Sequence, residues 1–303
     1  MKLITFVAGG QTRWGALHGE MAIDLNLARA MLLASRGLEA KYLASDALDF
    51  LRQGDSAWDA AQETVEFFGH RVVDGISFRK ETSTFLAPIN NPSKVIGIGL
   101  NYGEHRREHS SEQPGYPILF PKFPSSIIGP DDAITWDPAL TQQVDYEGEL
   151  GIVIGKRAKR VSEVEALEFV FGYCNLDDIS ARDLQFDDKG GKQWTRGKSL
   201  DTFCPIGPYI VSSDEIADAQ NLAVRTWVNG ELRQDSNTAN MISPVAQLVS
   251  FISQGITLLP GDIIASGTPS GVGHYRNPPV YLKPGDVIEV EVEGLGRLRN
   301  PVK

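Results

Sequence analysis

Short apolar runs that alternate with glycine- and proline-containing turns dominate the sequence from Val95 onward. The runs span residues 95–100, 118–123, 147–155, 169–177, 206–212, 224–229, 262–266 and 286–293. Runs of this length, bounded by turns, predict β-strands. Two helices are expected among them, one over residues 162–169, where Ser162 and Glu165 form a capping box, and one over residues 244–253. Many short strands with few helices favour a β-sandwich or a barrel-like roll over a doubly wound sheet.

The first 88 residues follow a different pattern, in which strands are followed by helices and no cluster of histidine, cysteine or carboxylate side chains suggests chemistry. The elements expected here are a hairpin from residues 3–8 and 16–25 and helices over residues 25–35, 48–51 and 58–68. A connector rich in proline and asparagine follows at residues 86–92. We therefore expect a mixed α/β chain dominated by β-structure, with a small α+β domain at residues 1–88 and a β-rich catalytic domain at residues 94–303.

The overall charge limits the kinds of molecule that the protein is expected to bind. Asp and Glu number 39 and Lys and Arg 29, so the formal net charge is −10 and the isoelectric point is near 5.1. This balance argues against nucleic acid or a membrane surface as partner, but it allows an anionic small molecule, because a bound cation inverts the local field. No apolar run reaches the length of a membrane span. Cys174 and Cys204 form no CxxC pair, and with the short apolar start of the chain they predict a reduced, cytoplasmic protein.

Glu147 and Glu149 stand at the start of a strongly apolar strand. Side chains alternate along a strand, so both glutamates point to one face, about 7 Å apart. Two carboxylates that enter a buried sheet without compensation would destabilise it by several kcal/mol. A divalent cation would remove both the repulsion and this cost. A solvated strand face is the alternative, which the apolar continuation of the strand disfavours.

A second acidic cluster follows the next apolar run. Asp178 in this cluster would complete a hard, all-oxygen site of the kind that suits Mg²⁺, Mn²⁺ or Ca²⁺, with Asp177 as the alternative ligand. Zinc is less well suited, because no histidine or cysteine lies directly beside these acids. Arg182 would either neutralise Asp178 or clamp a substrate carboxylate. A surface turn that contains an ion pair is the alternative interpretation.

His105 and Glu108 lie three residues apart, which is one turn of a helix. A carboxylate beside an imidazole orients the ring and raises its basicity, as a general base requires. An exposed polar helix without a role is the alternative, although a closing lid has the same character. The segment 105–109 also fits the H-x-x-E-H pattern of zinc peptidases, with His105 and His109 as ligands and Glu108 as the base, but the expected helix is short.

Small residues fill the segment 266–273, after another apolar run. Its backbone N–H groups and hydroxyls, those of Gly267 and Thr268 among them, are suited to an anion, although a tight turn between strands is the alternative. The segment lacks the Gly-Lys-Ser/Thr sequence of a P-loop, so no nucleotide phosphate is implied. Lys122 and Lys198, taken alone, are typical of surface lysines whose stems lie along apolar surface.

Six short motifs occur in one order along the chain. They are Gly99-Leu100-Asn101-Tyr102-x-x-His105-x-x-Glu108, Lys122 within residues 120–126, Glu147-Gly148-Glu149-Leu150-Gly151, Asp178-Ile179-Ser180-Ala181-Arg182-Asp183, Gly197-Lys198-Ser199-x-Asp201-Thr202-Phe203-Cys204-Pro205 and Ser266-Gly267-Thr268-Pro269-x-Gly271-Val272-Gly273. Together they resemble the fumarylacetoacetate hydrolase family over residues 94–303. The first 88 residues are similar to the small N-terminal domain of many bacterial members.

The resemblance implies the family's β-sandwich roll, a homodimer, and a role for each matched residue. Glu147, Glu149 and Asp178 match the ligands of Mg²⁺ or Mn²⁺, with Ca²⁺ sometimes in their place. His105 and Glu108 match a water-activating pair on a lid, and Lys198 matches a lysine that stabilises enolate charge. Positions near the carboxylate and oxo groups of the substrate are matched by Lys122, Arg182 and Thr268, and the adjacent Gly267 is expected to act with them.

Substrates of the family carry a 2-oxo acid or 1,3-dicarbonyl unit. Our first expectation is a metal-dependent hydrolase that cleaves a C–C bond in a 2,4-dioxo acid of the acylpyruvate, fumarylacetoacetate or fumarylpyruvate type, because both His105 and Glu108 are present. The alternative is a decarboxylase or isomerase of 2-oxo diacids in aromatic catabolism, of the oxaloacetate or 2-hydroxyhepta-2,4-diene-1,7-dioate type. A zinc peptidase and a non-catalytic binding protein are the rivals from other classes.

Overall fold

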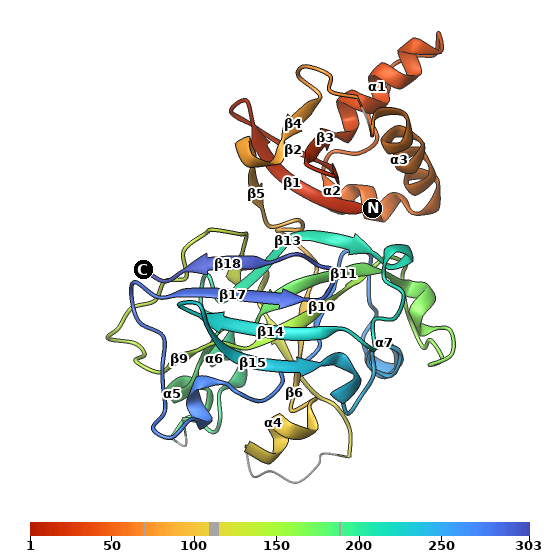
Figure 1. The fold of residues 1–303 in the computed structure, drawn as a ribbon. Helices are drawn as coiled ribbons and strands as arrows, with labels where there is room; N and C mark the ends of the chain where they lie inside the picture. Colours follow the sequence, from red (N-terminus) through yellow and green to blue (C-terminus); the bar gives the residue numbers. More distant parts are fainter. Residues whose placement is uncertain (70, 109–114, 188) are drawn as a thin grey trace.

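The computed structural model describes residues 1–69, 71–108, 115–187 and 189–303, and it has a smaller N-terminal part above a larger part in Figure 1. A large sheet runs through the larger part in the order β13 (Cys204–Ser212), β11 (Val170–Asp177), β10 (Gly148–Ile154), β16 (Ile263–Ala265), β6 (Val95–Gly99) and β7 (Ile118–Lys122). These neighbours are antiparallel except β16 and β6, which are parallel. The short strands are β8 (Ile127–Ile128), which pairs with β13, and β9 (Val144–Asp145), which pairs with β12 (Ser180–Ala181).

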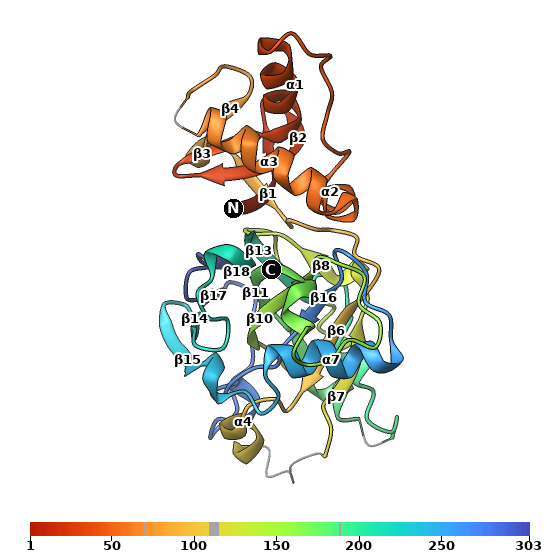
Figure 2. The ribbon, with the colours of Figure 1, turned by 90° about the vertical axis from the view of Figure 1, so that its right-hand side faces the viewer.

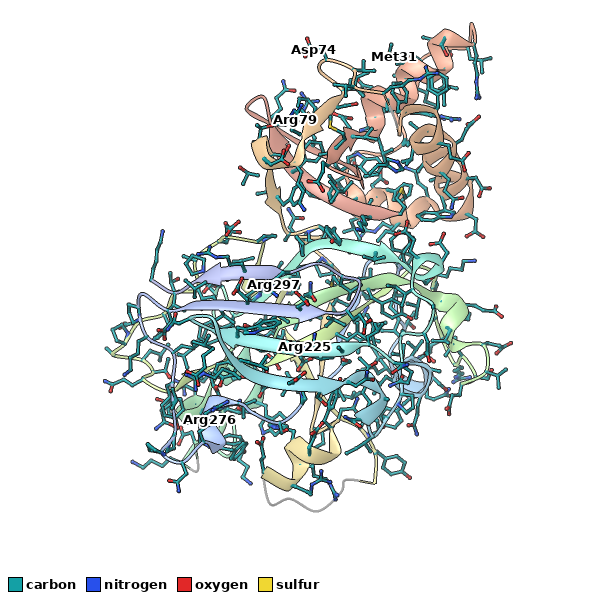
Figure 3. All side chains as sticks on the ribbon, viewed as in Figure 1. Met31, Asp74, Arg79, Arg225, Arg276 and Arg297 are labelled. Atoms are coloured by element: carbon teal, nitrogen blue, oxygen red, sulfur yellow. The ribbon has the colours of Figure 1, made fainter. Side chains whose placement is uncertain are left out.

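A second, antiparallel sheet covers one side of the larger part. Its strands lie in the order β15 (Glu231–Asn237), β14 (Ala223–Val228), β17 (Val287–Val292) and β18 (Leu298–Pro301). One face buries Val224, Val290 and Val292 against the large sheet. Arg225 and Arg297 lie on the other, solvent-facing side (Figure 3). Alternation of buried and exposed side chains along these strands is what face-to-face packing of two sheets requires.

The N-terminal part continues the large sheet rather than standing apart from it. Its strands are β1 (Lys2–Ala8), β2 (Gln11–His18), β3 (Met21–Asp24), β4 (Ser77–Arg79) and β5 (Thr84–Leu86), and its helices are α1 (Leu25–Ser35), α2 (Ala47–Gln53) and α3 (Asp55–Phe68). Strand β1 pairs with β13, where Leu3 lies opposite Ile210. Trp58 of α3 packs edge-on against Phe171 of β11, with ring centroids 5.4 Å apart. The two parts therefore share both a sheet and apolar contacts.

Strand β10 lies at the centre of the core, and all of its residues are buried. Leu150 and Ile152 belong to one apolar cluster, which also contains Leu248 and Val249 of α7 (Val245–Gly255). Val153 points the other way, into a cluster shared with the N-terminal helices. Figure 2 shows α7 beside the large sheet, away from the N-terminal part. A strand buried on both faces explains the near-continuous apolar run in its sequence.

The strands expected for residues 94–303 are present, and so is the expected helix after Pro244. The expected helix over residues 162–169 is wrong: the structure has a short 3₁₀ turn, Ala166–Phe169, and Ser162 Oγ donates to Glu165 Oε2 at 2.6 Å. Val164 is 96% exposed, so this segment has no continuous apolar face to bury, and packing of such a face is what stabilises most helices. The first hairpin is also tighter than predicted, since its turn is Gly9-Gly10.

The remaining helices are short. They are α4 (Gly103–Glu108), α5 (Arg182–Gln185) and α6 (Trp194–Lys198), with 3₁₀ turns at Lys80–Thr82, Pro124–Ser126, Ser213–Glu215, Thr238–Asn240 and Gly273–Tyr275. Among the described residues, none of the helices is long and apolar enough to cross a membrane.

Candidate active site

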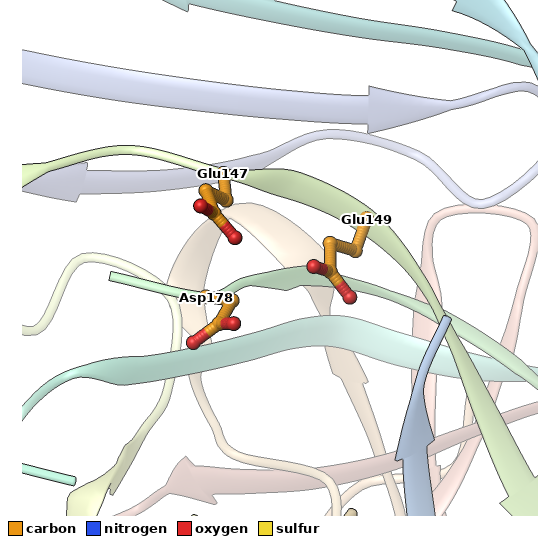
Figure 4. Close-up of side chains that lie close together, drawn as sticks. All are labelled: Glu147, Glu149 and Asp178. Carbon is orange, nitrogen blue, oxygen red and sulfur yellow. The ribbon is translucent and has the colours of Figure 1, made fainter. Parts of the chain in front are cut away.

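Three carboxylates, those of Glu147, Glu149 and Asp178, meet at one end of strand β10 (Figure 4). One carboxylate oxygen of each lies within 4.8 Å of the corresponding oxygens of the other two. The two glutamates flank Gly148, so the alternation of side chains along the strand puts them on one face. All three side chains are buried, so the group is shut off from bulk water.

Strand pairing brings Asp178 to the two glutamates. Gly148 lies opposite Asp177 in the antiparallel pairing of β10 with β11, and the N–H of Asp178 donates to the carbonyl of Glu147 at 2.9 Å. Asp177, the alternative ligand, uses Oδ1 to accept the N–H of Glu147 at 2.9 Å. Burial raises the pKa of Asp177 to about 7. The structure therefore brings Asp178 into the group of three, and Asp177 supports the backbone beside it.

Two buried lysines contact the same carboxylates. Nζ of Lys198 lies 2.8 Å from Oε2 of Glu147 and 2.7 Å from Oδ2 of Asp178. Nζ of Lys122 lies 2.6 Å from Oδ1 of Asp178. The surface-lysine interpretation is wrong for both, because Lys122 is 1% and Lys198 2% exposed. Lys198 also places its ammonium 5.1 Å from the ring centroid of Phe120, which holds the side chain from the apolar side.

Arg182 is buried beside the triad, as we call the carboxylates of Glu147, Glu149 and Asp178, and contacts two acids. Its Nη1 lies 2.6 Å from Oε1 of Glu147, and its Nη2 lies 2.8 Å from Oδ2 of Asp145 on β9. Arg182 therefore pairs with Glu147 and Asp145 rather than with Asp178. Its contact with a substrate carboxylate stays a prediction. Asp145 could not be singled out from the sequence, because its pairing with Arg182 depends on two strands that are distant along the chain.

Acidic side chains outnumber basic ones in this buried cluster. The cluster holds five acids and three bases, namely Asp145, Glu147, Glu149, Asp177 and Asp178 with Lys122, Arg182 and Lys198. Burial and the charges of Asp178 and Glu147 raise the pKa of Glu149 well above its usual range. Burial acts in the same direction on Glu147, but the charges of Lys198 and Arg182 outweigh it and hold the pKa of that carboxyl well below its usual range. The excess of two carboxylates and the all-oxygen donor set fit a divalent cation.

Helix α4 carries His105 and Glu108 to the same place. Nδ1 of His105 lies 3.3 Å from Oε2 of Glu108. The N–H of Gly271 donates to Oε1 of Glu108 at 3.0 Å and so ties the helix to the segment 266–273. The ring of His105 packs edge-on against Tyr275, with centroids 5.9 Å apart. The exposed-helix interpretation is therefore wrong for His105, which is 5% exposed.

The zinc-peptidase alternative requires His105 and His109 as ligands. His109 lies outside the described residues. Within the residues that the structure describes, the group of three or more potential ligands that comes together is the carboxylate triad. His105 faces Glu108, the residue that the peptidase pattern would make the base.

The segment 266–273 borders the triad, but its N–H groups contact carboxylates of the protein itself. Gly267 donates to Oε2 of Glu149 at 2.8 Å, and its φ of +96° is one that glycine adopts readily. Thr268 donates from Oγ1 to the carbonyl of Gly148 at 3.0 Å. The segment therefore orients a carboxylate of the candidate site, and its binding of a substrate anion stays a prediction.

These groups surround a small cavity of about 20 Å³. Its lining includes His105, Glu147, Arg182, Lys198, Thr268 and Tyr275, together with Phe120, Gln185, Phe186 and Trp194. A cavity of this size has room for a water molecule.

Sequence reasoning missed three lining residues, Gln185, Phe186 and Trp194. The sequence could have indicated Gln185, because it lies one helical turn after Arg182, from which it accepts a hydrogen bond at 3.0 Å. No sequence pattern indicates Trp194, because its position depends on contact with Gly99 of β6, which is distant along the chain. A Cβ atom on that glycine would lie 2.7 Å from Cζ3 of the indole.

Several known proteins are similar to this chain over most of its length. Residues 94–303 match the family model described as "Fumarylacetoacetate (FAA) hydrolase C-terminal". The chain is 45% identical to the mitochondrial oxaloacetate tautomerase fahd2 of Xenopus laevis, over 84% of this chain and 77% of that protein. Among solved structures, it is similar to a fumarylacetoacetate hydrolase from psychrophilic Exiguobacterium antarcticum, with a TM-score of 0.82 and 40% identity over 100% of this chain and 99% of that one.

A third similar protein is a 5-carboxymethyl-2-hydroxymuconate delta-isomerase from Mycobacterium smegmatis. The TM-score is 0.74 and the identity 33%, over 100% of this chain and 99% of that one. These full-length similarities confirm the fold class expected from the sequence. The names of the three proteins cover a tautomerase, a hydrolase and an isomerase.

Proposed function

Because the chain belongs to the fumarylacetoacetate hydrolase family, we propose that it is a divalent-cation-dependent tautomerase or isomerase of short 2-oxo diacids, with oxaloacetate as the first substrate to test. The observation that carries the proposal is the meeting of an oxygen-donor triad, a buried lysine and a histidine–carboxylate pair at one cavity. The sequence placed C–C bond hydrolysis first. The relative at 45% identity is named as an oxaloacetate tautomerase, so the comparisons favour the alternative.

Tautomerisation of a 2-oxo diacid moves one proton and one electron pair. The C3–H bond of the keto form breaks, an O–H bond forms at the 2-oxo oxygen, and no water is consumed. His105 would take the proton from C3 through Nε2, because Glu108 faces Nδ1 and orients the ring. Lys198 would hold the negative charge that develops on the 2-oxo oxygen. The protonated His105 then returns its proton to that oxygen.

Glu147, Glu149 and Asp178 would hold the cation, and Mg²⁺ and Mn²⁺ suit their oxygen donors. The bound cation would supply Lewis-acid polarisation of the 2-oxo group. Both steps of the proton transfer use side chains of the protein.

The four residues expected to bind substrate divide into two pairs. Arg182 and Thr268 line the cavity, and we propose that they contact the carboxylate and oxo groups of the substrate. Lys122 contacts Asp178, and Gly267 donates to Glu149. We therefore propose that these two act on the substrate through the carboxylates that they orient.

The two reactions make different demands on the site. A hydrolase must hold an attacking water beside the distal carbonyl of a longer dioxo acid, whereas a tautomerase needs the substrate and one proton carrier. The choice between them therefore rests on the relative that is named as an oxaloacetate tautomerase.

The small anionic substrate expected from the sequence agrees with the substrate named for the Xenopus laevis relative. The homodimer and the cytoplasmic location remain part of the proposal, and that relative is mitochondrial. Light scattering on the purified protein tests the dimer, and fractionation of the source cells tests the location.

The decisive experiment follows the enol form of oxaloacetate spectroscopically, with Mg²⁺ or Mn²⁺ present, and identifies the products. We expect the enol to decay faster with the protein than without it, with the keto form of oxaloacetate as the product. Release of CO₂ and pyruvate at the rate at which the enol decays would make the protein a decarboxylase. Pyruvate and acetate from acetylpyruvate, with no effect on the oxaloacetate enol, would restore the hydrolase.

A further inference from the structure

Gln234 of β15 is a buried amide directly behind the triad. It is 1% exposed, and its Oε1 accepts the N–H of Gly148 at 2.9 Å. Its Nε2 donates to Oγ1 of Thr268 at 2.8 Å and to the carbonyl of Pro269 at 2.9 Å. Gly148 is the residue between the two glutamates of the triad. One side chain from the second sheet therefore joins the strand that bears these glutamates to the segment 266–273.

That segment orients carboxylates from three different elements. The N–H of Gly267 donates to Glu149 of β10, as described above. The N–H of Gly271 donates to Glu108 of α4, and the N–H of Gly273 donates to Oδ1 of Asp145 of β9 at 2.7 Å. A shift of this segment would therefore move the ligand Glu149 and the partner of His105 together.

Strand β15 holds the segment at a second point. Nη2 of Arg276 donates to the carbonyl of Arg233, the neighbour of Gln234, at 2.9 Å and to the carbonyl of Gly271 at 3.3 Å, so it links β15 to the segment. Gly271 packs directly on that carbonyl, since a Cβ atom there would lie 2.2 Å from the oxygen, and its φ is +105°. The backbone of β15 thus limits the position of the segment by steric contact on one side. The amide of Gln234 links the segment to Gly148 by hydrogen bonds.

We infer that Gln234 is a positioning residue, which sets the separation between the strand bearing Glu147 and Glu149 and the segment that orients Glu149 and Glu108. Gln234 itself does not line the cavity as the structure describes it. The inference rests on the proposed function in one respect, that the triad holds a divalent cation. Residues that orient ligands in this indirect way change metal affinity or activity by about 10- to 100-fold when they are replaced.

Asn300 of β18 provides a matched control. It is 2% exposed, and its Nδ2 also donates to two backbone carbonyls, those of Gly129 at 2.8 Å and Asp132 at 2.9 Å. It makes none of the contacts with the triad or with the segment 266–273 that are described above. A purely structural role for a buried amide predicts the same consequences at both positions.

The test measures binding of Mn²⁺ alone to chelator-treated protein by electron paramagnetic resonance, with the melting temperature of each sample. For Gln234→Met we expect Mn²⁺ binding at least about tenfold weaker than in the wild type, and a fall in kcat larger than the change in KM. For Asn300→Leu we expect a lower melting temperature with Mn²⁺ affinity within about threefold. Gln234→Glu keeps the volume and the acceptor for Gly148 but loses the amide donors. It should show the same loss if Gln234→Met fails to fold.

Two results would overturn the inference in different ways. Wild-type Mn²⁺ affinity in both Gln234 variants, with stability lost as in Asn300→Leu, would make Gln234 structural and leave the proposed function intact. Failure of the wild-type protein to bind Mn²⁺ would remove the cation from the proposed function, and the inference with it.

Discussion

Nδ1 of His105 lies 3.3 Å from Oε2 of Glu108, one turn further along helix α4. The other oxygen of Glu108 accepts the backbone N–H of Gly271, so the carboxylate is held from both sides. An imidazole that is fixed through Nδ1 has Nε2 left for the cavity. This geometry fits the proposed role of His105 as a proton carrier that is oriented by Glu108.

Replacement of His105 by asparagine should abolish most of the proton transfer. General acid–base groups contribute about 10²- to 10⁴-fold, so we expect kcat/KM for enol–keto conversion of oxaloacetate to fall by at least about 100-fold. Glu108→Gln should cause a smaller loss, because the amide still contacts the ring but no longer stabilises its protonated form. Mn²⁺ affinity serves as the control and should stay within about threefold, because the triad is intact. Full activity of His105→Asn would exclude it as the proton carrier.

Replacement of Glu149 by glutamine should separate folding from cation binding. Burial and the charges of Asp178 and Glu147 raise the pKa of Glu149, so a neutral isostere relieves repulsion in the cation-free protein. We expect an equal or higher melting temperature for Glu149→Gln without metal, and no further rise when Mn²⁺ is added, since one ligand is lost. Scanning calorimetry with and without Mn²⁺ measures both quantities.

Asp177→Asn is the matched control for that experiment, because Asp177 is a buried neighbour outside the group of three. Its replacement still offers Oδ1 to the N–H of Glu147. The melting temperature of this variant should rise with Mn²⁺ as in the wild type. An equal rise in Glu149→Gln would show that Glu149 is not a ligand.

The two cysteines give a prediction about pH. Burial raises the pKa of Cys174 to about 12, with a further contribution from Cys204, and burial raises the pKa of Cys204 to about 12. An unfolded thiol ionises near pH ~8.5, so between that pH and about 12 the unfolded chain loses protons that the native chain keeps. The free energy of unfolding should therefore fall as pH rises through this range.

Denaturant unfolding at pH 8 and pH 10 measures the effect on the wild type and on a Cys174→Ala, Cys204→Ala double variant. The wild type should lose more stability between the two pH values than the variant. Neither thiol should react with a thiol reagent at pH 8 until the chain unfolds. Rapid labelling of the native protein would contradict the burial of both side chains.

Much of the site could be predicted from local spacing. Glu147 and Glu149 share a face because strand side chains alternate, and His105 meets Glu108 because three residues make about one helical turn. Asp178 could be placed with the glutamates through its motif, whereas its separation from Asp177 depends on the register of β10 against β11. Local periodicity thus predicts which residues of one helix or strand lie together, but it does not predict contacts between different elements.

Apart from the hydrogen bond between Arg182 and Gln185, the missed contacts described above join distant segments. Arg182 pairs with Asp145 across β12 and β9, and Gln234 reaches the triad from the second sheet. Strand β15 itself was not expected, because its sequence Glu231–Asn237 is polar almost throughout. Gln234 is the one residue of this strand that is buried, and it carries an amide. The strand therefore has no apolar alternation that would indicate it from the sequence.

The close approach of the two sheets at Gly148 leads to a prediction that a pair of substitutions tests. A Cβ atom on Gly148 would lie 2.1 Å from Oγ1 of Thr226 on β14, so Gly148→Ala forces the two sheets apart. Overpacking of a core typically lowers the free energy of unfolding by about 1–3 kcal/mol. Thr226→Ala should cost less, since Oγ1 is buried and has no hydrogen-bond partner among the described residues.

In the double variant the methyl group introduced at position 148 would occupy the space that the hydroxyl of Thr226 leaves. We therefore expect Gly148→Ala with Thr226→Ala to be more stable than Gly148→Ala alone, with a coupling of about 0.5–3 kcal/mol in a denaturant-based double-mutant cycle. Mn²⁺ affinity should recover in parallel, because Gly148 separates the two glutamates of the triad. Strict additivity of the two substitutions would mean that contacts other than Thr226 keep position 148 a glycine.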